Sequence, residues 1–195
     1  MTGVAAIIAG GRAERLGGQP KGLLTVGGRR IVDRQLEVLR SVFARVFMVA
    51  NDAAPFSDLG VAIVPDRLPG AGPLAGLDAA LAALRPDEPA VVCVAGDMPF
   101  LDPRALALLR DHAPGAEAVV PLIGERPDPL FARYARSCAP IVAEALAEGR
   151  RKAAALLDHL DVSYLDEATL RALDPTLAFL TNVNTPEDLA RFTTG

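Results

Sequence analysis

Short, continuous apolar runs alternate with longer segments of helical spacing over the first two thirds of the chain, and this alternation constrains the fold more than any other feature. Residues 4–9 (VAAIIA) and 90–97 (AVVCVAGD) lack the polar alternation of a half-solvated strand, so we expect them to be buried on both faces. Strands of this kind joined by helices predict right-handed βαβ units, which means an α/β fold with a mostly parallel sheet and helices on both faces. We expect strands at residues 4–9, 46–51, 61–66, 90–97 and 117–122, and helices at residues 31–43, 72–84 and 103–112.

The last third of the chain changes in pattern after Arg126. It contains the segment PDPLFARY, two alanine-rich helical segments, the short run VSYL and the segment FLTNVNTPEDL. We expect these as elements added at the later edge of the sheet. A final helix is expected to begin at Pro186, with Thr185 as its cap and Asp188 in the capping-box position.

The composition excludes several classes of protein. A length of 195 residues suits one compact domain. The net charge of −4 and the pI of about 5.2 argue against a broad nucleic-acid surface. No apolar run approaches the ~18 residues that a membrane span needs, so a cytoplasmic protein with no membrane and no nucleic-acid partner is expected. The two cysteines, Cys93 and Cys138, are too few for a disulfide framework, and Cys93 is expected to be buried.

The polar residues just after the predicted strands are the first candidates for a site, because ligands of open α/β sheets bind at the carboxyl ends of the strands. Asn51, Asp66 and Asp97 follow three of these strands, and a loop over residues 10–21 follows the first. Each also has a plain structural explanation, as a helix cap for Asp97 and as turn residues for Asn51 and Asp66.

The loop after the first strand combines glycine with positive charge, which favours phosphate binding. Residues 5–24 contain five glycines together with Arg12, Arg15 and Lys21. The Walker pattern fails because Pro20 precedes the lysine and Gly22 follows it, and the dinucleotide fingerprint fails because arginines stand where two of its glycines should be. Glycines nonetheless let backbone N–H groups approach an anion closely, and Arg15 and Lys21 supply charge. A merely flexible loop is the alternative.

Histidine and cysteine chemistry is not indicated. His112 and His159 are the only histidines, and each falls in or beside a helical pattern without acidic or cysteine partners nearby. Surface or helix-end positions are therefore expected, and no constellation for covalent or general-base catalysis is evident.

Five segments together resemble one family. The opening IIAGGRAERLGGQPKGLL is similar to the signature of nucleotidyltransferases that build activated sugars and molybdopterin dinucleotides. PGAGPLAGL, VAGDMPFLDP, RPDPLFARY and FLTNVNTPEDL follow in the order and spacing of the molybdenum cofactor guanylyltransferases. The chain departs from that family at Pro20, where an aspartate is usual, and at Asp128, where the family has histidine.

The resemblance implies a three-layer, Rossmann-like fold of the nucleotide-diphospho-sugar transferase type, forming one domain over residues 1–195. Residues 1–125 would bind the NTP and residues 126–195 the acceptor. It also implies site residues. Asp97 would hold Mg²⁺, and Asn182 and Asn184 would lie near the metal and the acceptor phosphate. The implied catalytic residues are Arg15, Lys21 and Asp97, and the implied nucleotide-binding residues are Ile8, Ala9, Gly10, Gly11, Lys21, Asn51, Asp66 and Asp97.

The reaction implied by the resemblance is transfer of GMP from GTP to the phosphate of molybdopterin or molybdenum-molybdopterin, with release of pyrophosphate. A phosphomonoester is largely dianionic at neutral pH because its second pKa is about 6, so its attack needs no general base. Molybdenum-insertion and delivery proteins are further implied partners. A cytidylyltransferase acting on the same pterin, a sugar-phosphate nucleotidyltransferase and a non-catalytic cofactor carrier are the alternatives.

Overall fold

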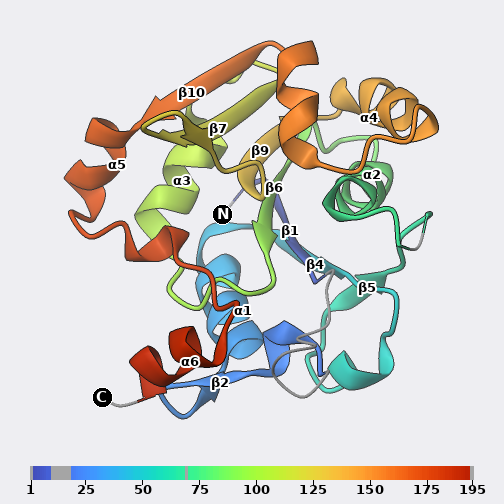
Figure 1. Cartoon of the computed structure of the whole chain (residues 1–195). Helices are drawn as coiled ribbons and strands as arrows, with labels where there is room; N and C mark the ends of the chain where they lie inside the picture. The colour runs from blue at the N-terminus through green and yellow to red at the C-terminus, as the bar shows by residue number, and fades with distance from the viewer. Residues whose placement is uncertain (1, 10–18, 69, 194–195) are drawn as a thin grey trace.

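An eight-stranded sheet forms the centre of the protein (Figure 1). The computed structural model describes residues 2–9, 19–68 and 70–193. The strand order across the sheet is β10-β7-β9-β6-β1-β4-β5, with β8 paired to β7. The strands are β1 (Val4–Ile8), β4 (Arg45–Val49), β5 (Ala62–Val64), β6 (Ala90–Ala95), β7 (Ala118–Ile123), β8 (Arg126–Pro127), β9 (Phe131–Ala135) and β10 (Val162–Asp166). A separate hairpin pairs β2 (Thr25–Val26) with β3 (Arg29–Arg30).

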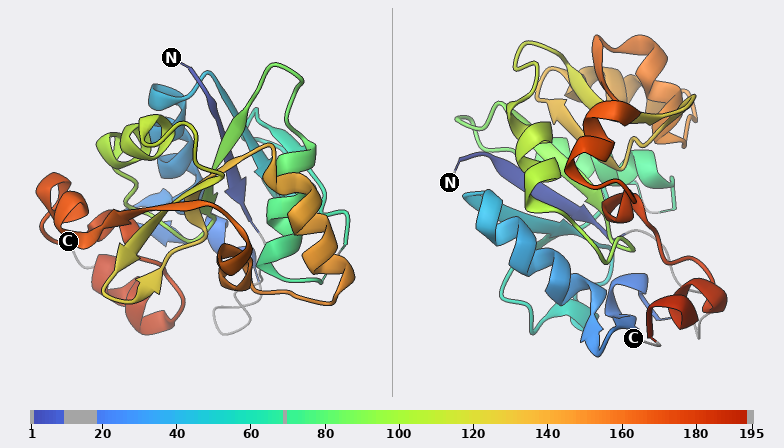
Figure 2. Two further views of the ribbon diagram at one scale, coloured as in Figure 1. Left: turned by 90° about the horizontal axis from the view of Figure 1, so that it is seen from above. Right: turned by 90° about the vertical axis from the view of Figure 1, so that its left-hand side faces the viewer.

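Helices cover both faces of the sheet, as the two views of Figure 2 show. One face carries α1 (Ile31–Val42), α3 (Pro103–Asp111) and α5 (Glu167–Leu173); the other carries α2 (Pro73–Ala82), α4 (Cys138–Ala147) and the 3₁₀ helix η4 (Ala153–His159). The three-layer α/β architecture predicted from the alternating pattern is therefore confirmed.

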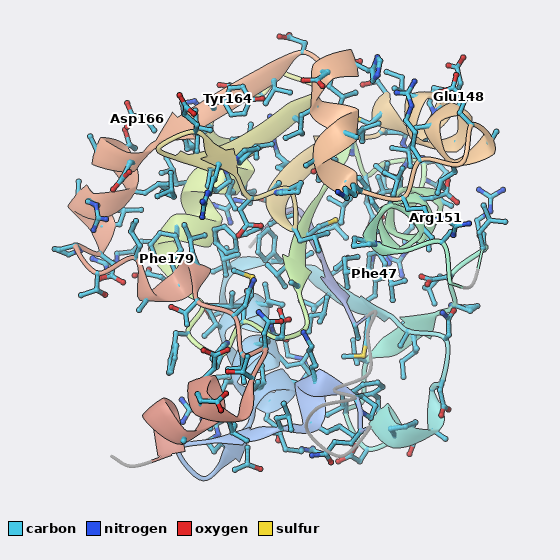
Figure 3. All side chains as sticks on the ribbon, viewed as in Figure 1. Phe47, Glu148, Arg151, Tyr164, Asp166 and Phe179 are labelled. Atoms are coloured by element: carbon cyan, nitrogen blue, oxygen red, sulfur yellow. The ribbon has the colours of Figure 1, made fainter. Side chains whose placement is uncertain are left out.

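The continuous apolar strands are explained by two hydrophobic cores, one on each side of the sheet. In β1 all five residues are buried, and alternate side chains enter opposite cores because successive residues of a strand point to opposite faces. Ile7 packs in the core that also contains Phe179, whereas Ile8 packs in the core that contains Phe47. Figure 3 shows Phe179 and Phe47 well apart, on the two sides of the sheet.

The prediction that the last third of the chain lies at the sheet's later edge is wrong for β9 and correct for β10. β9 lies inside the sheet and runs antiparallel to both β6 and β7. Its residues Phe131 to Tyr134 are all buried, as suits a strand in the interior of a sheet that is covered on both faces, whereas Tyr164 of the edge strand β10 is 44% exposed. The second alanine-rich segment also differs from expectation, because it forms the 3₁₀ helix η4 rather than an α-helix.

The C-terminal segment returns to the hairpin end of the molecule. The last helix, α6 (Pro186–Thr193), begins where it was predicted. Its start is a reciprocal capping box, in which Thr185 Oγ1 accepts from the Asp188 N–H at 3.1 Å and the Asp188 carboxylate accepts from the Thr185 N–H at 3.0 Å. Val183 packs with Leu24 and Val26 in a small third core, so the residues around it are held close to the segment that follows the glycine loop.

The helices in the described part of the chain give no sign of a membrane span, because none has both the length and the apolar composition that crossing a bilayer requires.

Candidate active site

The last residues of four neighbouring strands form one row across the sheet, and this register brings the site residues together. Ile8 of β1 pairs with Val49 of β4 and with Ala95 of β6, and Val49 pairs with Val64 of β5. Because these strands are parallel, the residues that follow them emerge at the same edge of the sheet. Two positions beyond the row stand Asn51, Asp66 and Asp97.

A pocket of about 570 Å³ opens at this edge, within the roughly 300–1,000 Å³ typical of small-molecule sites. It lies where the chain, having added β4 and β5 on one side of β1, crosses back to place β6 on the other side. Such a reversal is where open α/β sheets bind their ligands. The described residues that line it are Ile8, Ala9, Lys21, Gly22, Asn51, Asp66, Gly70, Gly72, Pro73, Gly76, Ala95, Gly96, Asp97, Asp128, Pro129, Leu130 and Asn182.

Lys21 and Asp97 meet in this pocket. The Lys21 Nζ donates to Asp97 Oδ2 at 2.9 Å and also to Asn184 Oδ1. The side chains of the ion pair are 24% and 14% exposed, so the pair is only partly screened by water. The other carboxylate oxygen, Asp97 Oδ1, is buried and has no hydrogen-bond partner in the described part of the chain. A buried carboxylate oxygen without a partner is in an unfavourable state unless a bound group satisfies it.

The backbone around Asp97 is fixed to two distant segments. The Gly96 N–H donates to Ile8 O at 3.0 Å, and the Val183 N–H donates to Asp97 O at 2.9 Å. A Cβ at Gly96 would stand 3.1 Å from the Cα of Ala9, so glycine permits this close approach of the two strand ends. The helix-cap explanation for Asp97 is wrong, because Asp102 caps α3 by accepting from the Arg104 N–H at 2.7 Å.

Asn51 and Asp66 form a second polar pair on the pocket wall. The Asn51 Nδ2 donates to Asp66 Oδ2 at 3.0 Å, and the Asp66 N–H donates to Asn51 Oδ1, also at 3.0 Å. Burial raises the pKa of Asp66, and the hydrogen bond from Asn51 offsets part of that rise. The two side chains hold each other in place on the pocket wall.

Asp128 lines the same pocket from the turn between β8 and β9. Its Oδ1 accepts from the Leu130 N–H at 3.1 Å. Burial raises the pKa of Asp128, and the nearby negative charge of Asp97 adds to the rise. The sequence marked this residue only as a departure from a motif; its position in that motif was the signal that it faces the site.

The charges of the pocket fit a bound divalent cation. The described lining residues supply three carboxylates, from Asp66, Asp97 and Asp128, against one ammonium, from Lys21. Among the described lining residues negative charge therefore exceeds positive charge, and a divalent cation would offset that excess. Hard divalent cations prefer carboxylate oxygens, and Mg²⁺ commonly takes only one or two of them and completes its shell with substrate phosphates and water. In the described residues no group of three or more carboxylate, histidine or cysteine side chains is placed to hold a metal ion together.

The other predicted residues divide into three groups. Gly10, Gly11 and Arg15 lie outside the described residues. Asn182 lines the pocket and Asn184 bonds Lys21, so both are brought to the site. The histidines are not in the pocket's described lining: His112 ends α3, and His159 is an exposed residue at the end of η4 that contacts Arg150.

Cys93 and Cys138 do not contribute to the site either. Both are buried in the core, and burial raises the pKa of each thiol to about 12, so neither is a nucleophile at neutral pH. The expectation that Cys93 is a buried apolar residue is confirmed.

Comparisons with known proteins extend over nearly the whole chain. A family model described as the MobA-like NTP transferase domain matches residues 5–166. The chain is 39% identical over 191 residues to a probable molybdenum cofactor guanylyltransferase of Pelotomaculum thermopropionicum, covering 97% of this chain and 90% of that protein. It is 32% identical to the molybdenum cofactor guanylyltransferase of Desulfosudis oleivorans, covering 98% and 93%. The crystal structure of molybdopterin-guanine dinucleotide biosynthesis protein A from Archaeoglobus fulgidus matches with a TM-score of 0.83 at 30% identity, covering 96% of this chain and 95% of that one.

Proposed function

The chain belongs to the MobA-like NTP transferase family and is a nucleotidyltransferase, and from that premise we propose that it transfers GMP from GTP to the phosphate of molybdopterin or its molybdenum form. The products are the molybdopterin guanine dinucleotide cofactor and pyrophosphate. Relatives that share most of their length with this chain carry the name molybdenum cofactor guanylyltransferase, which supports the choice of acceptor. We place the reaction in the cytoplasm.

The observation that carries the proposal is the meeting of Lys21 and Asp97 at the carboxyl end of β6. A cation and an anion side by side in a half-buried pocket suit a substrate that brings both phosphate and a metal ion. Asp97 would hold Mg²⁺ through Oδ1, the oxygen that has no partner in the described residues. When bound, the ion would neutralise charge on the phosphates during transfer.

The chain's own residues do the positioning. Ile8 and Ala9 present backbone groups at the end of β1, and the Asn51–Asp66 pair fixes the wall beside them. This end of the pocket would hold the guanosine. Asp128 and Asn182 come from the later part of the chain and would face the acceptor. The division into an NTP-binding part at 1–125 and an acceptor-binding part at 126–195 remains a prediction.

No proton needs to be removed from the attacking group, because a phosphomonoester is already largely dianionic at neutral pH. This agrees with the chemistry of the described lining, which contains carboxylates, amides and one lysine but no histidine, serine or cysteine. The enzyme's task is to hold two anions in line and to offset their repulsion.

The test is formation of the dinucleotide from purified molybdopterin, Mg²⁺ and one NTP at a time, with the product identified by mass. We expect product with GTP and little with CTP, ATP or UTP. Faster turnover with CTP would replace guanylyl by cytidylyl transfer and keep the reaction class. Tight binding of the pterin with no pyrophosphate released from any NTP would instead indicate a carrier.

A further inference from the structure

A buried glutamine lies directly behind the turn that carries Asp97. Gln35 belongs to α1 and is 0% exposed, among the apolar residues of that helix's buried face. Its Nε2 donates to Ala95 O at 2.7 Å and to Met98 O at 3.0 Å. The two carbonyls stand two residues before and one residue after Asp97, so a single amide group spans the turn.

We propose that Gln35 is a positioning residue, which fixes the Asp97 carboxylate for metal and phosphate binding by clamping both sides of its turn. The inference rests on the proposed function, since it assigns Gln35 a part in the same site. It adds a third anchor to the two already described, the Gly96–Ile8 and Val183–Asp97 backbone hydrogen bonds.

Packing alone does not call for glutamine at this position. The amide orientation is fixed, because two carbonyl oxygens can only be met by the donor side of the amide. The other side, Oε1, is buried without a hydrogen-bond partner in the described residues, which is an unfavourable state for a polar atom. A methionine or leucine would fill the volume without that cost. What glutamine adds is a pair of directed hydrogen bonds to the turn.

The clamp matters because the side chain of Asp97 has one hydrogen-bond partner in the described residues, so its direction depends on the backbone of the turn. One carboxylate oxygen bonds Lys21, a residue whose own charge is needed by the substrate, and the other oxygen has no partner in the described chain. If Lys21 turns toward a phosphate, the direction of the carboxylate depends on the backbone of the turn. Groups that orient a metal-binding carboxylate typically change metal affinity by about 10- to 100-fold when they are removed.

The test compares Gln35→Met with Leu39→Ala. Gln35→Met keeps the side-chain volume and removes both donors. Leu39 is equally buried on the same helix and has no polar side-chain atom, so its truncation destabilises the core without removing a hydrogen bond to the turn. The readouts are the melting temperature, the Kd of Mn²⁺ bound together with a GTP analogue whose α–β bridge is a methylene, and kcat and KM for GTP.

We expect Gln35→Met to weaken Mn²⁺ binding at least about tenfold and to lower kcat by a similar factor. Leu39→Ala should lower the melting temperature by at least as much as Gln35→Met does. Its Kd for Mn²⁺ should stay within twofold of the wild-type value. In an Asp97→Asn background, Gln35→Met should add no further loss of Mn²⁺ binding, because the residue it positions is already disabled. Should Gln35→Met fail to fold, Gln35→Leu, which also removes both donors and buries no charge, takes its place.

Unchanged Mn²⁺ affinity in the Gln35 variant, or losses that simply add in the double variant, would overturn the positioning role. Failure of the proposed function is visible separately. A wild-type protein that binds Mn²⁺ through Asp97 and forms no dinucleotide would refute the activity while leaving the clamp standing. A wild-type protein whose Mn²⁺ affinity does not depend on Asp97 would refute the clamp.

Discussion

Replacing Asp97 by asparagine removes one negative charge from the pocket while nearly preserving the size and shape of the side chain. In the folded protein the asparagine Oδ1 can still accept the hydrogen bond that Lys21 now gives to the carboxylate at 2.9 Å. Its NH₂ group then takes the place of the buried carboxylate oxygen that has no partner in the described residues. The substitution therefore separates what the charge does from what the shape does.

The expected loss of stability is modest. A hydrogen bond to a charged group contributes about 1.5–3 kcal/mol and one between neutral groups about 0.5–1.5, so weakening the Lys21 contact costs about 1 kcal/mol. Leaving the amide NH₂ buried and unpaired costs about another 1 kcal/mol. A total of about 2 kcal/mol lowers the melting temperature of a chain of this length by about 4–8 °C. The protein should remain folded at the assay temperature.

The expected loss of activity is much larger. Removing one preorganised electrostatic contact to a transition state costs on the order of 10²–10³-fold in rate. We expect dinucleotide formation by Asp97→Asn to fall by at least about 10²-fold, and raised Mg²⁺ or Mn²⁺ to restore part of the loss if metal affinity is the defect.

The matched control is Asp102→Asn. Asp102 lies five residues after Asp97. It is also paired with a cation, Arg104, and it caps α3. Asparagine caps a helix about as well as aspartate, so this variant should keep full activity. The measurement is product formation across a metal titration, beside melting curves, for both variants. An Asp97→Asn enzyme that works at the wild-type rate in low Mg²⁺ would refute the metal assignment.

Three further substitutions test other parts of the site and fold. Lys21→Met should weaken GTP binding by about 10- to 100-fold, the value of a charge-assisted contact, with a small change in melting temperature; wild-type affinity in an equilibrium titration would remove Lys21 from the phosphate site. Gly76→Ala should destabilise the protein by about 1–3 kcal/mol in denaturant unfolding, because the new methyl would stand 2.5 Å from the Ile8 Cγ2. Arg45 bonds Glu88 through both oxygens and holds the pKa of that carboxyl below its ordinary range. Stability from this pair is complete above the ordinary glutamate pKa of about 4.3 and is lost as pH falls through the lower folded value. Glu88→Gln should therefore lower the melting temperature at pH 7 and flatten its fall in acid, and parallel curves would contradict this.

The fold was predictable from the sequence wherever a local pattern of apolar residues indicates which residues are buried. Helix α1 shows its helical period directly, and the sheet type follows from strands such as β1 that are apolar on both faces. The place of β9 was not predictable in the same way. Its insertion between β6 and β7 depends on a long-range antiparallel pairing that no local pattern encodes.

The site was predictable to the extent that the sheet's geometry determines it. Asn51, Asp66 and Asp97 could be grouped in advance because parallel strands present their carboxyl ends at one edge. Gln35 could not, although its place on the apolar face of α1, four residues before Leu39, marks it in retrospect as a polar group that is buried for a reason. Its role depends on which turn the helix packs against, and that is a tertiary contact.

The balance of charge in the pocket leads to a conclusion about how its two substrates enter. The described lining holds three carboxylates and one lysine, so this part of the pocket favours an anion that arrives together with a cation. Lys21 is also engaged, because Asp97 and Asn184 both accept from its ammonium. A nucleotide that arrives with a divalent cation changes both conditions at once: the cation offers Asp97 a stronger partner than Lys21, and Lys21 is released toward the phosphates. Metal and nucleotide binding should therefore be mutually reinforcing, each tightening the other by the same factor as linkage requires. In the Asp97→Asn enzyme that coupling should be lost even where some affinity for each remains.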